Sequence, residues 1–142
     1  KEDDSYWKKC EEVIRKLPPN IIVTYKGTLC HDDIHKTFSL YDALLFPTLS
    51  ENYGHVIAES LASGCIPIIS DQTPWNDMND YSAGWAIPLT SQNAFINAIQ
   101  TVVDMNEIEI DNKRKSIVIY LEGKFRISAL KEEYLNLFSY TY

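Results

Sequence analysis

The stretch YDALLFPTLSENYGHVIAESLASGCIPIIS, residues 41–70, contains two short apolar runs separated by a polar loop and a helical pattern. The runs at 43–46 and 66–69 lack the alternation of half-exposed strands, which predicts strands buried on both faces. Between them we expect a helix over about residues 55–63, ended by Gly64. Two buried strands joined by a helix predict a right-handed parallel crossover.

The same alternation extends upstream of this unit. Acids followed by apolar residues at helical spacing predict a helix over residues 6–17, which the next two prolines end. A β-branched run at 21–25 predicts a strand that ends at Gly27. Apolar residues at helical spacing then predict a second helix over residues 34–41.

Downstream, strands and helices continue to alternate. We expect a short helix over residues 75–81, a strand over 85–89 and a helix that includes residues 95–103. Beyond residue 106 the apolar spacing is helical only, which predicts a C-terminal tail of two helices over residues 106–142.

Buried strands joined by helical crossovers predict an α/β fold, with a Rossmann-like parallel sheet flanked by helices. The length suits a single domain over residues 1–142. Because the sequence starts on a helix, we expect this domain to be partial and its sheet to lack its first strand or strands.

Composition narrows the class of function. Thirteen basic against twenty acidic residues give a net charge of −7, and no Lys/Arg run could track a nucleic-acid backbone. No apolar stretch approaches the ~20 residues that span a bilayer, and the charged N-terminus does not resemble a signal peptide. Three widely spaced cysteines suit reduced thiols. These features favour a cytoplasmic protein that does not bind nucleic acid.

The loop before the middle helix has the properties of a phosphate-binding segment. In a doubly wound sheet, ligands bind outside the carboxyl ends of the strands, where helix N-termini offer free N–H groups. Pro47 ends the first strand, Gly54 permits a close turn, and residues 55–57 would present unpaired amides. We therefore expect a diphosphate to bind there without a Walker lysine.

Two acids flank this segment. Glu59 is one turn into the helix, and helical side chains lean toward the N-terminus, so its carboxylate should face the loop that holds Glu51. A carboxylate can accept hydrogen bonds from two hydroxyl groups, so the pair could hold a ribose and a hexose. This chemistry indicates a nucleotide-sugar; the alternative is that both acids are ordinary surface groups.

The run ENYGHVIAESLASGCIPIIS, residues 51–70, resembles the E-x7-E region of retaining glycosyltransferases of family 4, also described as glycosyl transferases group 1. An acid, an aromatic–Gly pair, a second acid and a strand with Gly and Pro follow in the order of that family. The similarity covers roughly residues 20–105, including YKG at 25–27 and YDALLFPT at 41–48. It implies the C-terminal, nucleotide-sugar-binding half of a GT-B fold.

The resemblance also implies roles for individual residues. Glu51 would be the catalytic group, acting as a positioning acid rather than as an established nucleophile, and Glu59 would hold the ribose hydroxyls. The loop with Gly27 and Thr28 would contact the nucleobase. The donor sugar and the diphosphate would be bound by Asn52, Tyr53, Gly54, His55 and Val56.

The implied reaction is metal-independent transfer of a hexose, with retention at the anomeric carbon, to a polysaccharide, lipopolysaccharide or glycolipid acceptor. No cofactor or metal is expected. The family's Arg and Lys on an earlier strand, and its acceptor domain, have no counterpart in this sequence. We therefore expect the fragment alone to be inactive, with the acceptor, and any peripheral contact with the inner membrane face, left to a missing N-terminal domain.

Alternatives are open for several of these features. A non-catalytic α/β module, which binds a nucleotide or another protein, is the second function. Cys30, His31 and His35 could together suggest zinc, but a complete ligand set is lacking. Trp75 could line a cleft or anchor a short helix, and the ring of Tyr53 could pack rather than bind.

Overall fold

A computed structural model describes the backbone of residues 4–139, and the side chains in that range except at 4, 127, 128 and 136–139. The chain divides into two compact units, residues 1–30 and 31–142. The prediction of a single domain stays a prediction.

The first unit contains one helix, α1 (Asp4–Ile14), which ends before the predicted position because residues 16 and 17 make turn-type bonds ahead of the prolines. The predicted strand at 21–25 is wrong. These residues form no strand, and Ile22 is 85% exposed. No described strand pairs with them, and a strand without a paired neighbour is not stable by propensity alone. Within this unit, the ring centroids of Trp7 and Tyr25 lie 5.2 Å apart.

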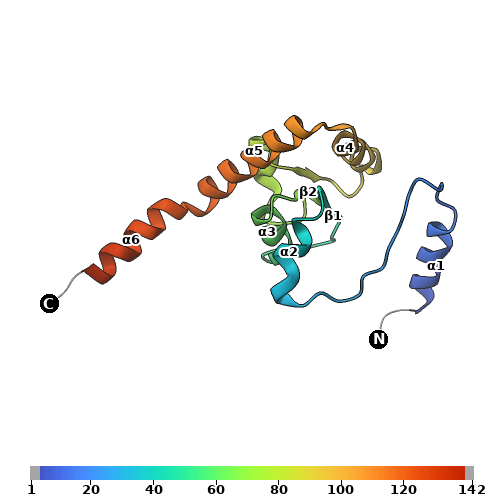
Figure 1. Ribbon diagram of the computed structural model, residues 1–142, viewed down its shortest axis with the longest axis horizontal. Coiled ribbons are helices and arrows are strands. Elements are labelled where there is room, and N and C mark those ends of the chain that lie inside the picture. Colours follow the sequence, from blue (N-terminus) through green and yellow to red (C-terminus); the bar gives the residue numbers. More distant parts are fainter. Residues whose placement is uncertain (1–3, 140–142) are drawn as a thin grey trace. The chain divides into compact units, whose positions relative to one another are not determined.

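The second unit contains a three-stranded parallel sheet, in the order β1 (Ala43–Phe46), β2 (Ile66–Ser70), β3 (Trp85–Ile87) (Figure 1). Every residue of β2 is buried, as expected for the central strand of a sheet covered on both faces. β3 ends earlier than predicted, and Pro88 begins the turn into the next helix, where its carbonyl accepts the Ser91 N–H. The predicted α/β fold with a Rossmann-like parallel sheet is confirmed.

The strands are joined by one α-helix and one 3-10 helix. α3 (His55–Ala62) connects β1 to β2, and η2 (Asn76–Tyr81) connects β2 to β3. Upstream of the sheet, a 3-10 turn, η1 (His31–Asp33), leads into the short helix α2 (Ile34–Phe38). The expected helices are therefore present, with that over 34–41 shorter than predicted.

Three helices follow the sheet: α4 (Gln92–Asp104), α5 (Glu107–Phe125) and α6 (Ile127–Ser139). Asn106 begins α5 with a capping box. The Asn106 side chain accepts from the Glu109 N–H, and the Glu109 carboxylate accepts from the Asn106 N–H. Arg126, at φ 46°, separates α5 from α6. The two-helix tail is confirmed up to residue 139; residues 140–142 lie outside the described residues.

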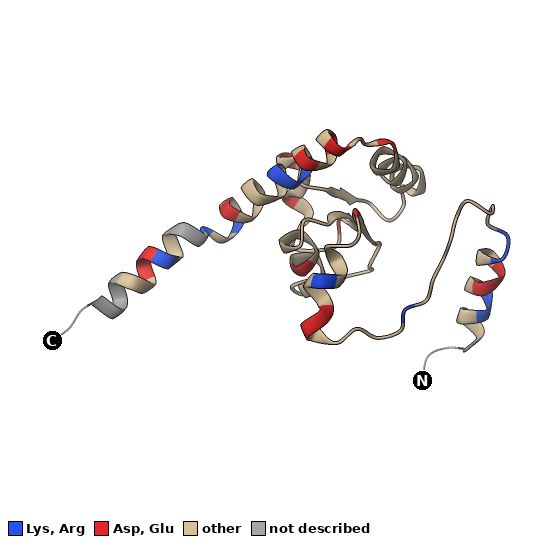
Figure 2. Cartoon of the chain, viewed as in Figure 1, with Lys and Arg blue, Asp and Glu red and all other residues tan. Residues whose placement is uncertain are grey.

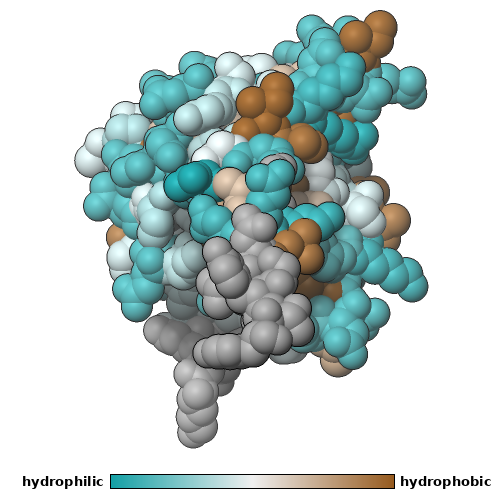
Figure 3. All heavy atoms as spheres, turned by 90° about the vertical axis from the view of Figure 1, so that its left-hand side faces the viewer, coloured by the Kyte–Doolittle hydropathy of each residue, from teal (hydrophilic) through white to brown (hydrophobic). Residues whose placement is uncertain are grey.

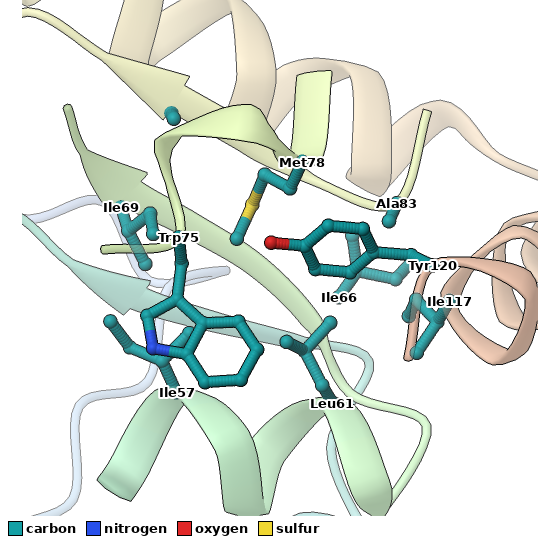
Figure 4. Packing of buried hydrophobic residues seen from close by; sticks show 10 residues of the cluster. Ile57, Leu61, Ile66, Ile69, Trp75, Met78, Ala83, Ile117 and Tyr120 are labelled. Atoms are coloured by element: carbon teal, nitrogen blue, oxygen red, sulfur yellow. The ribbon is translucent and has the colours of Figure 1, made fainter. Parts of the chain in front are cut away.

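Successive strand residues point to opposite faces of the sheet, and every residue of β2 is buried, so both faces are covered by helices. Ile68 and Ile87 pack with Ala98 and Val102 of α4. The other cluster joins the sheet to α3, η2 and α5. Figure 4 shows it, with Trp75 over α3 and Tyr120 entering from α5; its largest buried side chains are Ile57, Leu61, Ile66, Ile69, Trp75, Met78, Ile117 and Tyr120.

The outer edge of β3 is occupied by a side chain. In the parallel register, the backbone groups of Ala86 face away from β2. Asn79 of η2 donates its amide to the Ala86 carbonyl and accepts the Ala86 N–H, each at 2.9 Å. One asparagine thus replaces a further strand, whereas on the outer side of β1 no described strand pairs.

Charged residues are dispersed over the helices. Figure 2 shows Lys and Arg on α1, α2, α5 and α6, interspersed with Asp and Glu. On the face in Figure 3, hydrophilic residues predominate and hydrophobic ones form small separate groups. Among the described helices, none combines the length and apolar character that a bilayer crossing requires.

Candidate functional site

The candidate site lies in the loop between β1 and α3. Gly54 is the residue before the helix and has φ 76°, a left-handed conformation that favours glycine. Its carbonyl accepts from the N–H groups of Ile57 and Ala58. No acceptor within residues 4–139 takes the N–H groups of His55 and Val56. The prediction of unpaired amides therefore fits His55 and Val56 but is wrong for Ile57.

The loop before α3 is attached to the loop after β2. Trp75 donates its indole N–H to the Tyr53 carbonyl at 2.6 Å, and the Glu51 N–H donates to the Gln72 carbonyl at 3.3 Å. Both loops follow carboxyl ends of neighbouring parallel strands, which meet at one edge of the sheet. The free amides therefore lie at the edge where α/β folds bind ligands.

Glu59 lies on the second turn of α3, and its side chain is 24% exposed. Its Oε1 is 3.9 Å from Nδ1 of His31, an exposed ring that forms an ion pair only when protonated. That separation is too long for a hydrogen bond, so the carboxylate oxygens remain able to accept hydroxyl groups. Glu59 is thus a half-buried acid next to the predicted binding loop.

Glu51 lies in the loop and is partly buried. Among the described residues, no side chain forms a hydrogen bond or ion pair with its carboxylate. The structure places Glu51 before α3 and Glu59 within it, in the same unit. Their convergence on one ligand stays a prediction.

The remaining predicted sugar and diphosphate residues lie on the loop surface. Asn52 and His55 are exposed, and Tyr53 is 45% exposed. The Tyr53 ring contacts His55 at 4.7 Å and Trp75 at 6.0 Å between centroids. The ring is thus both in contact with its neighbours and partly open to solvent, so packing and a binding role are compatible.

Two predictions concern residues outside this arrangement. Gly27 has φ 72° and lies with Thr28 in the first unit, so their contact with a nucleobase stays a prediction. His35 has Nδ1 2.8 Å from the Ser63 hydroxyl, and His31 lies beside Glu59. Within the described part of the chain, no three His, Cys, Asp or Glu side chains gather as metal ligands would.

An ion-pair network supports the site from α5. Asp77 accepts from Tyr120 Oη at 2.5 Å and from Lys124 Nζ at 2.7 Å, and Lys124 also donates to the Pro74 carbonyl. Burial would raise the pKa of Asp77, but the two hydrogen bonds and the Lys124 charge outweigh it and hold that pKa below its usual range. Burial and the Asp77 carboxylate raise the pKa of Tyr120.

Sequence reasoning considered Trp75 as an anchor, which its 1% exposure confirms, but missed Asp77, Tyr120 and Lys124. The i, i+4 spacing of Tyr120 and Lys124 places both on one helical face and could have signalled a shared partner. Nothing in the sequence identifies Asp77 as that partner.

A groove of about 770 Å³ lies elsewhere, between β1, β2, α4 and α5, and includes Leu45, Ile68, Val102 and Arg114. It involves none of the predicted site residues. Its volume alone does not identify it as a ligand site.

Of the comparisons with known proteins, one identifies a family. Searches of curated proteins and of solved structures returned no significant match. A family model described as glycosyl transferases group 1 matches residues 3–120, which include the sheet, the loop and both acids. Since this match covers most of the 142 residues, the chain belongs to the glycosyl transferases group 1 family.

Proposed function

We propose that this chain binds the nucleotide-sugar donor of a retaining glycosyltransferase, which moves a hexose to a polysaccharide, lipopolysaccharide or glycolipid acceptor. Family membership supports a donor-binding role. The observation that carries the proposal is the opening of α3, where the N–H groups of His55 and Val56 have no acceptor within residues 4–139. Free amides at a helix N-terminus attract a diphosphate through hydrogen bonds and the helix dipole.

The two acids bind the hydroxyl groups on either side of this diphosphate. Glu59 accepts from the ribose, and Glu51 accepts from the transferred sugar and positions it. Asn52 and Tyr53 complete the sugar side of the loop. Gly27 and Thr28 contact the nucleobase.

In the proposed reaction the acceptor oxygen bonds to the anomeric carbon on the face from which the diphosphate leaves. The bond from that carbon to the diphosphate oxygen breaks, and the acceptor proton passes to the leaving diphosphate. Glu51 contributes position rather than a covalent bond, and no metal takes part. In this proposal the reaction is carried out by a larger protein, whose N-terminal domain binds the acceptor. That protein acts in the cytoplasm or peripherally at the inner membrane face.

The test is titration of the 142-residue chain with UDP, GDP and ADP by calorimetry. We expect one of them to bind, and Glu59→Ala to weaken it tenfold or more, since a hydrogen bond to a charged group contributes about 1.5–3 kcal/mol. Glu132→Ala, at an exposed position of α6, makes the same charge change and should leave binding unaltered.

Glu51→Gln tests the sugar end of the donor apart from the nucleotide end. It should leave the affinity for the nucleoside diphosphate unaltered and remove the additional affinity that the chain has for the matching nucleotide-sugar. The absence of binding by all three nucleoside diphosphates at millimolar concentration would overturn the proposal and favour a non-catalytic α/β module.

A further inference from the structure

The loop before α3 has few attachments to the rest of the protein. Asn52 and Tyr53 are exposed, and the Glu51–Gln72 bond is long at 3.3 Å. Two short bonds attach this loop to the rest of the described chain, each at 2.6 Å: the Ser70 hydroxyl donates to the Thr48 carbonyl, and the Trp75 indole N–H donates to the Tyr53 carbonyl, next to Gly54.

Trp75 is itself held firmly. Its side chain is 1% exposed, and its ring centroid lies 6.2 Å from that of Tyr120 and 5.8 Å from that of Phe125. Lys124 Nζ lies 5.1 Å from the ring centroid, on a side chain that also bonds Asp77 and the Pro74 carbonyl. The indole N–H is therefore a donor fixed by the core and by α5, as Figure 4 shows for the ring.

A fixed Tyr53 carbonyl also fixes the next N–H group. The peptide between Tyr53 and Gly54 is trans, so its carbonyl and its N–H point in opposite directions. Because the carbonyl points at Trp75, the Gly54 N–H points away from Trp75. No acceptor within residues 4–139 takes this N–H either.

We propose that Trp75 is a positioning residue for the donor site: its indole N–H orients the Tyr53–Gly54 peptide so that the Gly54 amide joins those of His55 and Val56. This inference rests on the proposed function for its ligand. It goes beyond it by assigning the geometry of the loop to a buried residue on the neighbouring loop. The close approach supports it, since a Cβ on Gly54 would lie 3.2 Å from the indole nitrogen.

The Tyr53–Gly54 peptide can be observed by itself. Tyr–Gly occurs once in the sequence, so the chain labelled with 13C-carbonyl tyrosine and 15N-glycine gives a single HNCO peak. We expect Trp75→Phe, which keeps a buried ring but removes the donor, to move this peak. Trp85→Phe, which removes an indole from β3, should leave it in place. This measurement needs no ligand.

The ligand measurement uses whichever of UDP, GDP and ADP binds most tightly. We expect Trp75→Phe to weaken that affinity about tenfold, as for the loss of one well-oriented anion contact. Tyr120→Phe, which removes the bond to Asp77 but keeps the indole donor, measures the effect of destabilisation alone. Urea unfolding of both variants gives their free energies of unfolding, so that the affinity losses can be compared at equal destabilisation.

The outcomes are distinct. A moved peak in Trp75→Phe, with an affinity loss larger than that of Tyr120→Phe, supports the inference. An unmoved peak, or an affinity loss no larger than in Tyr120→Phe at matched stability, overturns it.

If the wild-type chain binds none of the nucleotides, the proposed function fails, and the HNCO peak alone decides whether Trp75 orients the peptide. If Trp75→Phe does not fold, the wild-type indole resonances decide: solvent exchange at Trp75 no slower than at Trp7 and Trp85 overturns the inference, and markedly slower exchange supports it.

Discussion

At the scale of single residues, Gly54 is constrained twice. Its φ of 76° is left-handed, and a Cβ there would lie 2.9 Å from Ile57 Cδ1 as well as close to Trp75. Gly64, at the other end of α3, has nearly the same φ of 75°, but its nearest neighbours would be at 3.7 Å, on the Arg114 side chain. A comparison of the two glycines therefore distinguishes the cost of backbone strain, which both share, from the cost of side-chain crowding, which only Gly54 has.

We predict that Gly64→Ala costs about 1–2 kcal/mol, the strain of a left-handed alanine. Gly54→Ala should cost more, because the Ile57 and Trp75 side chains must also move. Urea denaturation of the two variants measures the difference. Equal losses would show that the crowding is relieved without cost.

At the scale of secondary-structure elements, the packing of η2 depends on side chains that imitate backbone pairing. The Asn79 amide forms both hydrogen bonds that a neighbouring strand would give Ala86. Ala86 is itself 7% exposed, so its N–H and carbonyl would be poorly solvated if Asn79 were lost.

Asn79→Ala is expected to lower the free energy of unfolding by about 1–2 kcal/mol, because two backbone groups lose their partners. Asn97→Ala, at an exposed position of α4, provides the control and should change stability little. Thermal unfolding of both variants tests this, and a loss for Asn79→Ala no greater than that of the control would contradict the role of the side chain as a strand substitute.

At the scale of the whole molecule, the Asp77–Tyr120–Lys124 network joins η2 to α5. The lowered pKa of Asp77 stabilises the folded chain above the ordinary carboxyl value of 3.8, and this contribution is lost as the pH falls through the lower folded pKa. The raised pKa of Tyr120 has the opposite sign: its contribution is present below the ordinary value of 10.0 and is lost as the pH rises from there.

Asp77→Asn should therefore flatten the loss of stability in acid. At neutral pH we expect a cost below about 1 kcal/mol, because the Asp77 side chain is 45% exposed and solvent screens the ion pair. Asp80→Asn, in the same 3-10 helix, controls for the change in net charge. Urea midpoints between pH 2 and pH 7 provide the measurement, and parallel curves for Asp77→Asn and the wild type would refute it.

The sequence predicted the parts of this molecule that depend on local patterns. Apolar runs located β1 and β2, and Gly64 marked the end of α3. The strand at 21–25 failed because a strand requires a neighbour, which propensity does not supply. The free amide of Val56 followed from helix geometry, but the bonds of Trp75 and Asp77 join residues 22 and 43 or more positions apart and leave no local signal.

The occupied border of β3 makes growth of the sheet one-sided. Asn79 already uses both outward-facing groups of that short strand, so a newcomer there would first have to displace it. At β1 no described strand stands in the way. An extended segment, whatever its source, should therefore join the sheet more readily at the β1 border than at the β3 border, where the Asn79 side chain must first be displaced.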